Sequence, residues 1–450
     1  MRDLTWRRAL GLAAWAVTGV VVVLGLLFLG TTIPTRPVVA LAAAGSVLVL
    51  GLSALRPVFL PLVAMPCAVL VVRVPAVPGG ISAADVATFA AVWPALFLAT
   101  KRYTEPMRAI IWLVVVYQCA TLFAVVANPY AANVIDWWHT LFLVAGSLVV
   151  GWAVAREGYA RTGMTLLLLV AAALAVATLA QGLLQIAGGD LTPVRVEWPF
   201  PMHKNFVGTT LAAVAVIMYA RPRWMGWSVR WSNALLAASI LGVLMTQSRQ
   251  GLIGLGAAFV YVVLRTGQDR RRSKLILVTI PPTLAIIVFT VMQQFASGNR
   301  FNSSQQRLDW FRDSIDIWLH SPWFGVGLRW WYTARFDTQF QPPNAELEVL
   351  TTAGVVGLAG FLVLVLGTLR VLSRLDPTYG TLAVAVVFNR FVQGQFDLFW
   401  ASVGASVPFL IAGICLGAQA HRDEVLEPPP PEPPRHAKEE TDALDRADLA

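Results

Sequence analysis

The chain has 450 residues, of which 57% are hydrophobic and only 13% are charged, and its formal net charge at pH 7 is +9. Its mean hydropathy is +0.65. This composition excludes an ordinary soluble domain and indicates a membrane protein with many spans.

Apolar runs close to the length that crosses about 30 Å of hydrocarbon recur along most of the chain. In order they are 9–30, 37–55, 57–73, 84–100, 107–127, 134–155, 164–187, 206–220, 233–247, 249–265, 275–292, 347–370, 378–394 and 398–418. The sequence therefore predicts an all-α polytopic integral membrane protein with about 12–14 transmembrane helices, the lower number applying if a short pair is re-entrant. The first run lacks a signal-peptide cleavage site, and we interpret it as a retained span.

The positions of arginine and lysine predict the orientation. If the N-terminus is cytoplasmic, most of these residues fall in short inner connections, as the positive-inside rule requires. The net charge then reflects topology, and we expect no nucleic-acid partner. Both termini are expected in the cytoplasm, and 188–205, Gln247–Gln250 and the long polar loop 293–346 are expected together on the outer face.

Composition divides the chain into three parts. Residues 1–187 form an N-terminal set of spans, and 188–420 form a second unit that contains the long loop. From 421 to 450 the chain is rich in proline and charge, beginning near the run Glu427-Pro-Pro-Pro-Pro-Glu432. Such a segment cannot bury a core, so we expect a disordered cytoplasmic tail.

The long loop 293–346 is predicted to contain an amphipathic helix. Ser303 and Gln306 have the spacing of a capping box, apolar residues then repeat at helical spacing, and Pro322 ends the pattern. We expect this helix to lie on the outer membrane surface. The nearby tryptophans Trp323, Trp330 and Trp331 allow either sugar stacking or an aromatic interface belt.

Arg249 stands at the junction of two predicted spans, where a charge is costly. One interpretation is that it reaches water or pairs with a carboxylate such as Asp85. The other is that Arg249, Arg195 and Lys204 bind a phosphate or diphosphate, because guanidinium groups match phosphate oxygens with paired donors. Three cations in two outer connections favour an anionic ligand at the outer leaflet.

Four motifs in order resemble signatures of the bacterial O-antigen ligase and O-antigen polymerase family. They are the segment Arg195-Val-Glu-Trp-Pro-Phe-Pro-Met-His-Lys-Asn205, the turn Thr246-Gln-Ser-Arg249-Gln-Gly251, the run Arg307 to Trp310 leading to Ser321-Pro-Trp-Phe-Gly325-Val-Gly327, and Asn344 followed by Gly354 and Gly357. The resemblance covers roughly 190 to 365. Each motif is weak alone, and the four together are fairly specific.

The resemblance implies an outer-face glycosyltransferase of the bacterial plasma (inner) membrane, without metal or other cofactor. It would transfer a glycan from an undecaprenyl-diphosphate carrier to an acceptor hydroxyl of a lipid, a glycan or a protein in cell-envelope polysaccharide assembly. Arginines would stabilise the leaving diphosphate more in the transition state than in the ground state. Arg195 and Arg249 are the expected catalytic cations, and the expected substrate-binding residues are Lys204, Asn205, Gln247, Gln250, Arg307 and Asn344.

One position departs from the family pattern, because Pro343 stands where the family usually has a histidine that is its expected base. Proline can neither accept nor donate a proton. If a helix begins just after it, Glu346 lies on the same face and is the first candidate for a replacement base, with His203 second. The alternatives are a structural role for either residue at a helix start and a reaction that needs no strong base.

Three functions remain open at this point: a ligase, a polymerase whose acceptor is another lipid-linked repeat, and a non-enzymatic transporter of lipid or polysaccharide. A transporter is expected to show internal repeats and broken spans with midplane charge, and no clear repeat is detectable. Ligase and polymerase share fold and donor, so only their products distinguish them.

Overall fold

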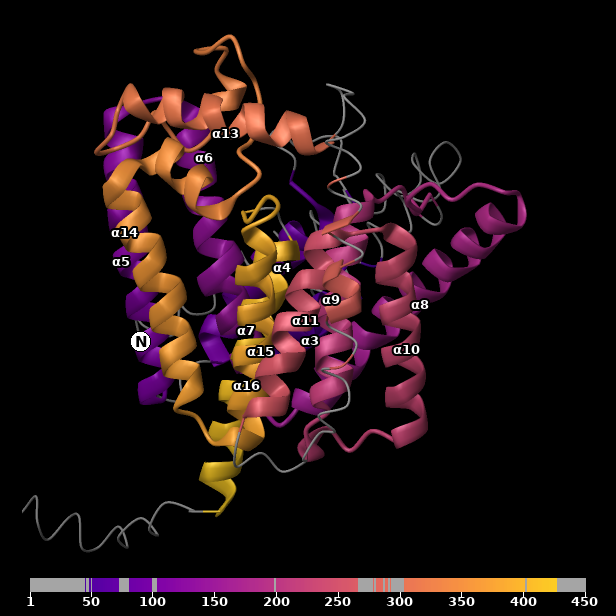
Figure 1. Cartoon of the computed structure of the whole chain (residues 1–450). Coiled ribbons are helices and arrows are strands. Elements are labelled where there is room, and N and C mark those ends of the chain that lie inside the picture. Colours follow the sequence, from indigo (N-terminus) through magenta and orange to yellow (C-terminus); the bar gives the residue numbers. More distant parts are fainter. Residues whose placement is uncertain are drawn as a thin grey trace, which may run out of the picture.

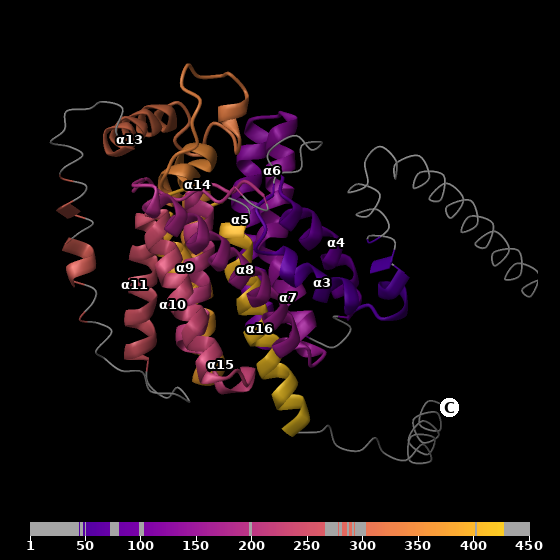
Figure 2. The same ribbon diagram turned by 90° about the vertical axis from the view of Figure 1, so that its right-hand side faces the viewer.

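The computed structural model describes residues 51–72, 81–98, 103–197, 200–265, 303–400 and 403–426, with a few isolated residues between 45 and 49 and between 278 and 292. This part of the chain is almost entirely helical (Figures 1 and 2). An antiparallel bridge joins Val196 to Met202 in the described residues. The chain is therefore an all-α polytopic membrane protein, as the composition predicts.

The helices follow one another with short connections over most of the described chain. They are α3 (Phe59–Cys67), α4 (Ala83–Leu98), α5 (Glu105–Ala127), α6 (Ala131–Leu141), α7 (Ser147–Arg156), α8 (Ala160–Ala187), α9 (Lys204–Ala220), α10 (Val229–Thr246), α11 (Arg249–Leu264), α13 (Ser303–Leu319), α14 (Ala345–Ser373), α15 (Pro377–Gly394) and α16 (Val403–Leu426). A π-helical turn, Phe142–Gly146, joins α6 to α7 in one continuous rod. Short 3-10 turns lie at Arg223–Met225 and Trp330–Tyr332.

Six helices in the described part are long and apolar enough to span a membrane. They are Glu105–Ala127, Ala131–Arg156, Ala160–Ala187, Val229–Thr246, Ala345–Ser373 and Gly404–Leu426. Helices α4, α9 and α11 are also apolar but shorter. The most central span is α16, where 89% of the apolar window is buried inside the protein.

Most consecutive spans run in opposite directions, with α6 and α7 together forming one span, so the connections gather at two ends of the bundle (Figure 1). One end, which we call the loop end, carries the α8–α9 connection, the α10–α11 turn, the segment 320–344 and the α15–α16 connection. The opposite end carries basic residues, including Arg422, which pairs with Asp376 at 2.6 Å, and Arg265, which donates to the carbonyl of Ser373.

The predicted amphipathic helix of the long loop is α13, which lies crosswise over the loop end (Figure 1). A small separate core holds it there. Ile317 of α13 packs with Val326, Trp330 and Phe340 of the following segment, and the ring of Trp310 stacks on that of Phe340 at 5.5 Å. Trp330 is only 1% exposed, so it is a core residue and not a surface for sugar stacking.

The segment after α13 is bonded into a break in α14. Gly354 has φ 67° and ψ −165°, which interrupts the helix. The backbone of 322–327 fills the interruption: Val326 and Gly327 donate to the carbonyls of Thr351 and Thr352. In return, the amides of Val355 and Val356 donate to the carbonyls of Pro322 and Trp323. The two glycine-containing motifs, far apart in sequence, are therefore two sides of one contact.

The predicted spans between 84 and 265 and beyond 347 each correspond to a helix. The runs 9–30 and 275–292, and most of 37–55, lie outside the described residues, so the total number of spans stays a prediction. Helix α16 continues to Leu426, so the first residues of the predicted tail are helical. Arg156 holds this last turn through Glu424, and residues 427–450 lie outside the described part.

Candidate functional site

The α8–α9 connection is fastened to the neighbouring helix ends. The amide of Val194 donates to the carbonyl of Met245 at 3.0 Å. The side chain of Gln247 donates to the carbonyl of Leu191 at 2.8 Å, and that of Gln181 donates to the carbonyl of Arg195. These bonds hold Arg195 at the loop end, next to the start of α9.

Two helix starts present the next cations. His203 caps α9 by accepting the amide of Asn205 on its Nδ1 atom, so that Lys204 is the first helical residue. Gln247 adopts a left-handed conformation, with φ 50°, which turns the chain from α10 into α11 and makes Arg249 the first residue of α11. A sharp turn and a histidine cap thus place Lys204 and Arg249 at the same end of the bundle.

Four cations converge at this end, and we call Arg195, Lys204, Arg249 and Arg307 the cation group. Lys204 lies within electrostatic range of the other three, and Arg249 lies within range of Arg307. The members come from four segments, with Arg307 supplied by α13. Because like charges repel, their convergence is costly in the free protein and suits a site for an anion.

A cavity of ≈ 140 Å³ lies beside the cation group. Its lining consists of His203, Asn205, Phe206, Thr209, Arg390, Asp397, Leu398 and Gly404. Partial burial and the positive charges of Arg195 and Lys204 lower the pKa of His203, while Asp397 opposes this effect. His203 therefore faces the cavity chiefly in its neutral form.

Asp397 is the carboxylate of this cavity. Its Oδ2 atom accepts hydrogen bonds from Asn205 Nδ2 and Gln250 Nε2, both at 2.8 Å. Gln250 is 3% exposed, so the bond to it is sheltered from water. The two amides orient the carboxylate without neutralising it, and Asp397 interacts electrostatically with Lys204 and Arg390.

Arg390 is a buried cation, 4% exposed, in the last turns of α15. Its guanidinium donates to the carbonyls of Leu398 and Phe399 and lies 5.1 Å from the centre of the Phe399 ring. It thus fixes the α15–α16 connection that carries Asp397. Its position inside the apolar run 378–394 is a signal of function that the sequence contains, because a charge within a span is costly.

The start of α14 is joined to the same connection. Asn344 caps the helix by accepting the amide of Leu347 at 2.9 Å, and its Nδ2 donates to the carbonyl of Gln395. Glu346 accepts the side chain of Gln395 at 2.8 Å, while its other oxygen is buried without a hydrogen-bond partner in the described structure. Pro343 is buried immediately before the cap.

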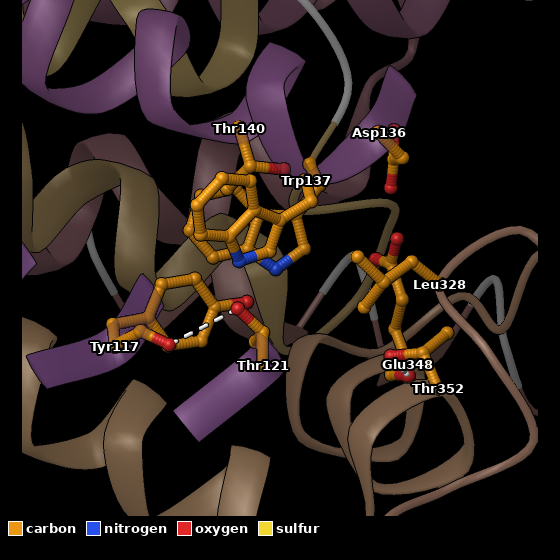
Figure 3. A pocket seen from close by; sticks show the side chains of 9 residues that line it. Tyr117, Thr121, Asp136, Trp137, Thr140, Leu328, Glu348 and Thr352 are labelled. Atoms are coloured by element: carbon orange, nitrogen blue, oxygen red, sulfur yellow. Dashed lines mark hydrogen bonds between the residues drawn. The ribbon is translucent and has the colours of Figure 1, made fainter. Parts of the chain in front are cut away.

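A second polar group lies on the other side of the α15–α16 connection, around a cavity of ≈ 20 Å³ (Figure 3). It is lined by Tyr117, Thr121, Asp136, Trp137, Thr140, Leu328, Glu348, Thr352 and Trp400. Glu348 accepts the side chain of Gln341 at 2.6 Å, and Asp136 pairs with Arg329 at 2.6 Å. The volume suits about one water molecule. This group joins the loop to α6 and α14.

Asp85 belongs to this second side of the protein. Its Oδ2 atom accepts from the amide and hydroxyl of Ser82 and lies 3.5 Å from His139 Nε2. The sequence suggested Asp85 as a partner for Arg249, whereas the structure places it in a chain that runs from α4 to His139 of α6.

The structure gathers most of the residues singled out in the sequence. Arg195, Lys204, Arg249 and Arg307 form the cation group, and His203, Asn205 and Gln250 surround Asp397. Gln247, Asn344 and Glu346 lie at the same end but bond to the connections, as given above. Asp397 was missed: in the sequence it is one acidic residue in a short connection, with no motif around it.

Comparison with protein families gives one match. Residues 234–362 match the family model described as O-Antigen ligase. The matched region runs from α10 to the middle of α14 and includes Arg249, Arg307, Asn344 and the break at Gly354. It excludes Arg195, Lys204 and Asp397. No curated protein matches the chain. The family match confirms the resemblance that the sequence motifs indicate.

Proposed function

We propose that this membrane protein, which carries an O-antigen ligase domain at residues 234–362, transfers a glycan from a polyprenyl-diphosphate carrier to an acceptor hydroxyl. The domain supports a membrane enzyme of cell-envelope glycan assembly. The donor, the direction of transfer and the roles of individual residues belong to the proposal. We place the reaction at the outer face of the bacterial plasma membrane.

The convergence of the cation group supports this proposal most strongly. Cleavage of the bond between a sugar and a diphosphate leaves negative charge on the departing phosphate oxygens. Fixed cations stabilise that charge more in the transition state than in the ground state, which accelerates the reaction. Guanidinium groups are suited to this task because they offer paired donors to phosphate oxygens.

The proposal gives each neighbouring residue a role. Arg195, Lys204, Arg249 and Arg307 bind the diphosphate. Asn205 and Gln250 orient Asp397 next to it, as their bonds to this carboxylate suggest. Gln247 and Asn344 act mainly by holding the connections and the start of α14, and α13 covers the site while supplying Arg307.

The distribution of charge supports the proposed orientation. Basic residues such as Arg265 and Arg422 lie at the opposite end of the bundle, which the positive-inside rule assigns to the cytoplasm. The loop end, with the cation group, would then face outward. A lipid-linked donor in the outer leaflet would bring its diphosphate to this level.

A deletion strain provides the test. Loss of the protein should leave glycan on its carrier, and this accumulated lipid serves as donor for purified protein in lipid nanodiscs with an envelope extract as acceptor. Arg249→Gln should lower transfer by about 100-fold or more. Arg312→Gln is the matched control, because Arg312 is an exposed residue of α13 paired with Asp309.

The products discriminate between the functions. Transfer of preassembled glycan to a different acceptor supports a ligase, whereas growth of the lipid-linked glycan itself indicates a polymerase. Wild-type protein that moves no sugar to any acceptor but carries the lipid across the bilayer would refute the enzyme. Full transfer by Arg249→Gln would refute the role of the cation group.

A further inference from the structure

Asp397 stands where the proposed reaction needs a proton acceptor. It lines the 140 Å³ cavity next to the cation group, and its Oδ2 atom is held by two amide donors at 2.8 Å. A carboxylate whose role was to neutralise the cation group would bond directly to those cations, whereas the Oδ2 atom of Asp397 is bonded to two amides.

Charged and titratable groups face Asp397 from each surrounding element. His203 and Lys204 lie at the start of α9, Arg390 on α15, and Arg249 on α11 next to Gln250. Of these, His203, Lys204 and Arg390 interact electrostatically with Asp397, while Arg195 of the α8–α9 connection and Arg307 of α13 interact with Lys204. On α14, Glu346 bonds to Gln395 and Glu348 accepts the amide of Phe399 in the same connection as Asp397. Asp397 is thus a carboxylate bordered mostly by cations.

The two bases considered from the sequence are less suited to the cavity. His203 accepts the amide of Asn205 on Nδ1, so its neutral ring carries the proton on Nε2 and can only donate there. Glu346 does not line the cavity, and one of its oxygens is bonded to Gln395. Asp397 is the carboxylate among the residues that line it.

We propose that Asp397 is the general base that accepts the proton of the acceptor hydroxyl, an inference that rests on the proposed glycan transfer. The acceptor oxygen attacks the anomeric carbon and forms the new glycosidic bond. The bond from that carbon to the phosphate oxygen breaks, and its electron pair leaves with the diphosphate. The acceptor proton passes to Asp397, which later releases it to water.

The experiment compares Asp397→Asn with wild-type protein in nanodiscs, using lipid-linked glycan from the deletion strain as donor. Asparagine keeps an oxygen for the bonds from Asn205 and Gln250. Turnover should fall by about 100-fold or more, whereas the KM for the donor should not rise. Asp190→Asn is the matched control, because Asp190 is exposed in the α8–α9 connection and bonds to Thr192.

Azide separates loss of the base from a structural defect. The azide ion attacks the anomeric carbon without losing a proton, so it should restore release of the diphosphate by Asp397→Asn and yield a glycosyl azide. Asp397→Glu should retain part of the turnover. Wild-type turnover in Asp397→Asn would overturn the inference, as would a loss that azide fails to restore. Failure of the wild-type protein to transfer glycan would instead contradict the proposed function.

Discussion

The contact between Gly354 of α14 and the segment 322–327 leads to a quantitative prediction. A methyl group at Gly354 would lie less than 3.0 Å from the backbone of Trp323 and Phe324, a distance that real Cβ atoms essentially never show. The backbone there also has φ 67° and ψ −165°, a region that is nearly restricted to glycine. Backbone strain of this kind costs about 1–3 kcal/mol, and overpacking costs about 1–3 kcal/mol more.

Gly354→Ala should therefore lower the free energy of unfolding by about 2–6 kcal/mol, or displace the loop from α14. The assay is thermal unfolding in detergent, followed by tryptophan fluorescence, combined with limited proteolysis of residues 320–344. Gly256→Ala is the control, because nothing lies within 4 Å of a Cβ at Gly256 and alanine favours a helix by about 0.5–1 kcal/mol. An unchanged melting temperature and unchanged protease resistance in Gly354→Ala would refute the reasoning.

Two further predictions concern the ion pairs and the cavity. Arg329→Ala should destabilise the protein by about 3 kcal/mol, because it removes the partly buried partner of Asp136. Arg312→Ala should change stability by less than about 1 kcal/mol, because the ion pair of Arg312 is exposed. Equal effects of the two variants in chemical unfolding would contradict this expectation. The pKa of His203 is lowered in the folded protein. As the pH falls through 6.5, the usual pKa of histidine, the unfolded chain therefore binds more protons than the folded protein, and the free energy of unfolding should decrease. His203→Gln should weaken this dependence, and an identical pH profile would exclude His203 as its source.

Periodicity predicted the helices because the membrane imposes a strong requirement for apolar length. The helical run from Ser303, the helix start after Pro343 and the turn at 246–251 were likewise predicted from the sequence, since each depends on residues close in sequence. The glycines of 325–327 and 354 were recognised only as motifs. Their physical reason, a shared backbone contact, joins segments that the sequence separates and therefore required the structure.

In the candidate site too, some residues could be predicted from the sequence and others required the structure. Arg249 could be chosen from the sequence because a charge at the junction of two spans is costly, and Arg195 because it is a cation of an outer connection within a family-like motif. Asp397 could not, because its importance depends on bonds from Asn205 and Gln250, which lie far away in sequence. Glu346 was chosen from helical spacing alone, and spacing did not reveal that its partner is Gln395.

Binding of the carrier itself tests the central claim most directly. The affinity of the purified protein for undecaprenyl diphosphate in nanodiscs should be compared with that of variants in which Arg195, Lys204, Arg249 or Arg307 is replaced by glutamine. Each replacement should weaken binding by roughly tenfold or more, since a hydrogen bond to a charged group contributes about 1.5–3 kcal/mol. Undecaprenyl phosphate should bind to the wild-type protein less tightly than undecaprenyl diphosphate does. Equal affinity of all four variants and the wild-type protein would contradict the assignment of the cation group to the diphosphate.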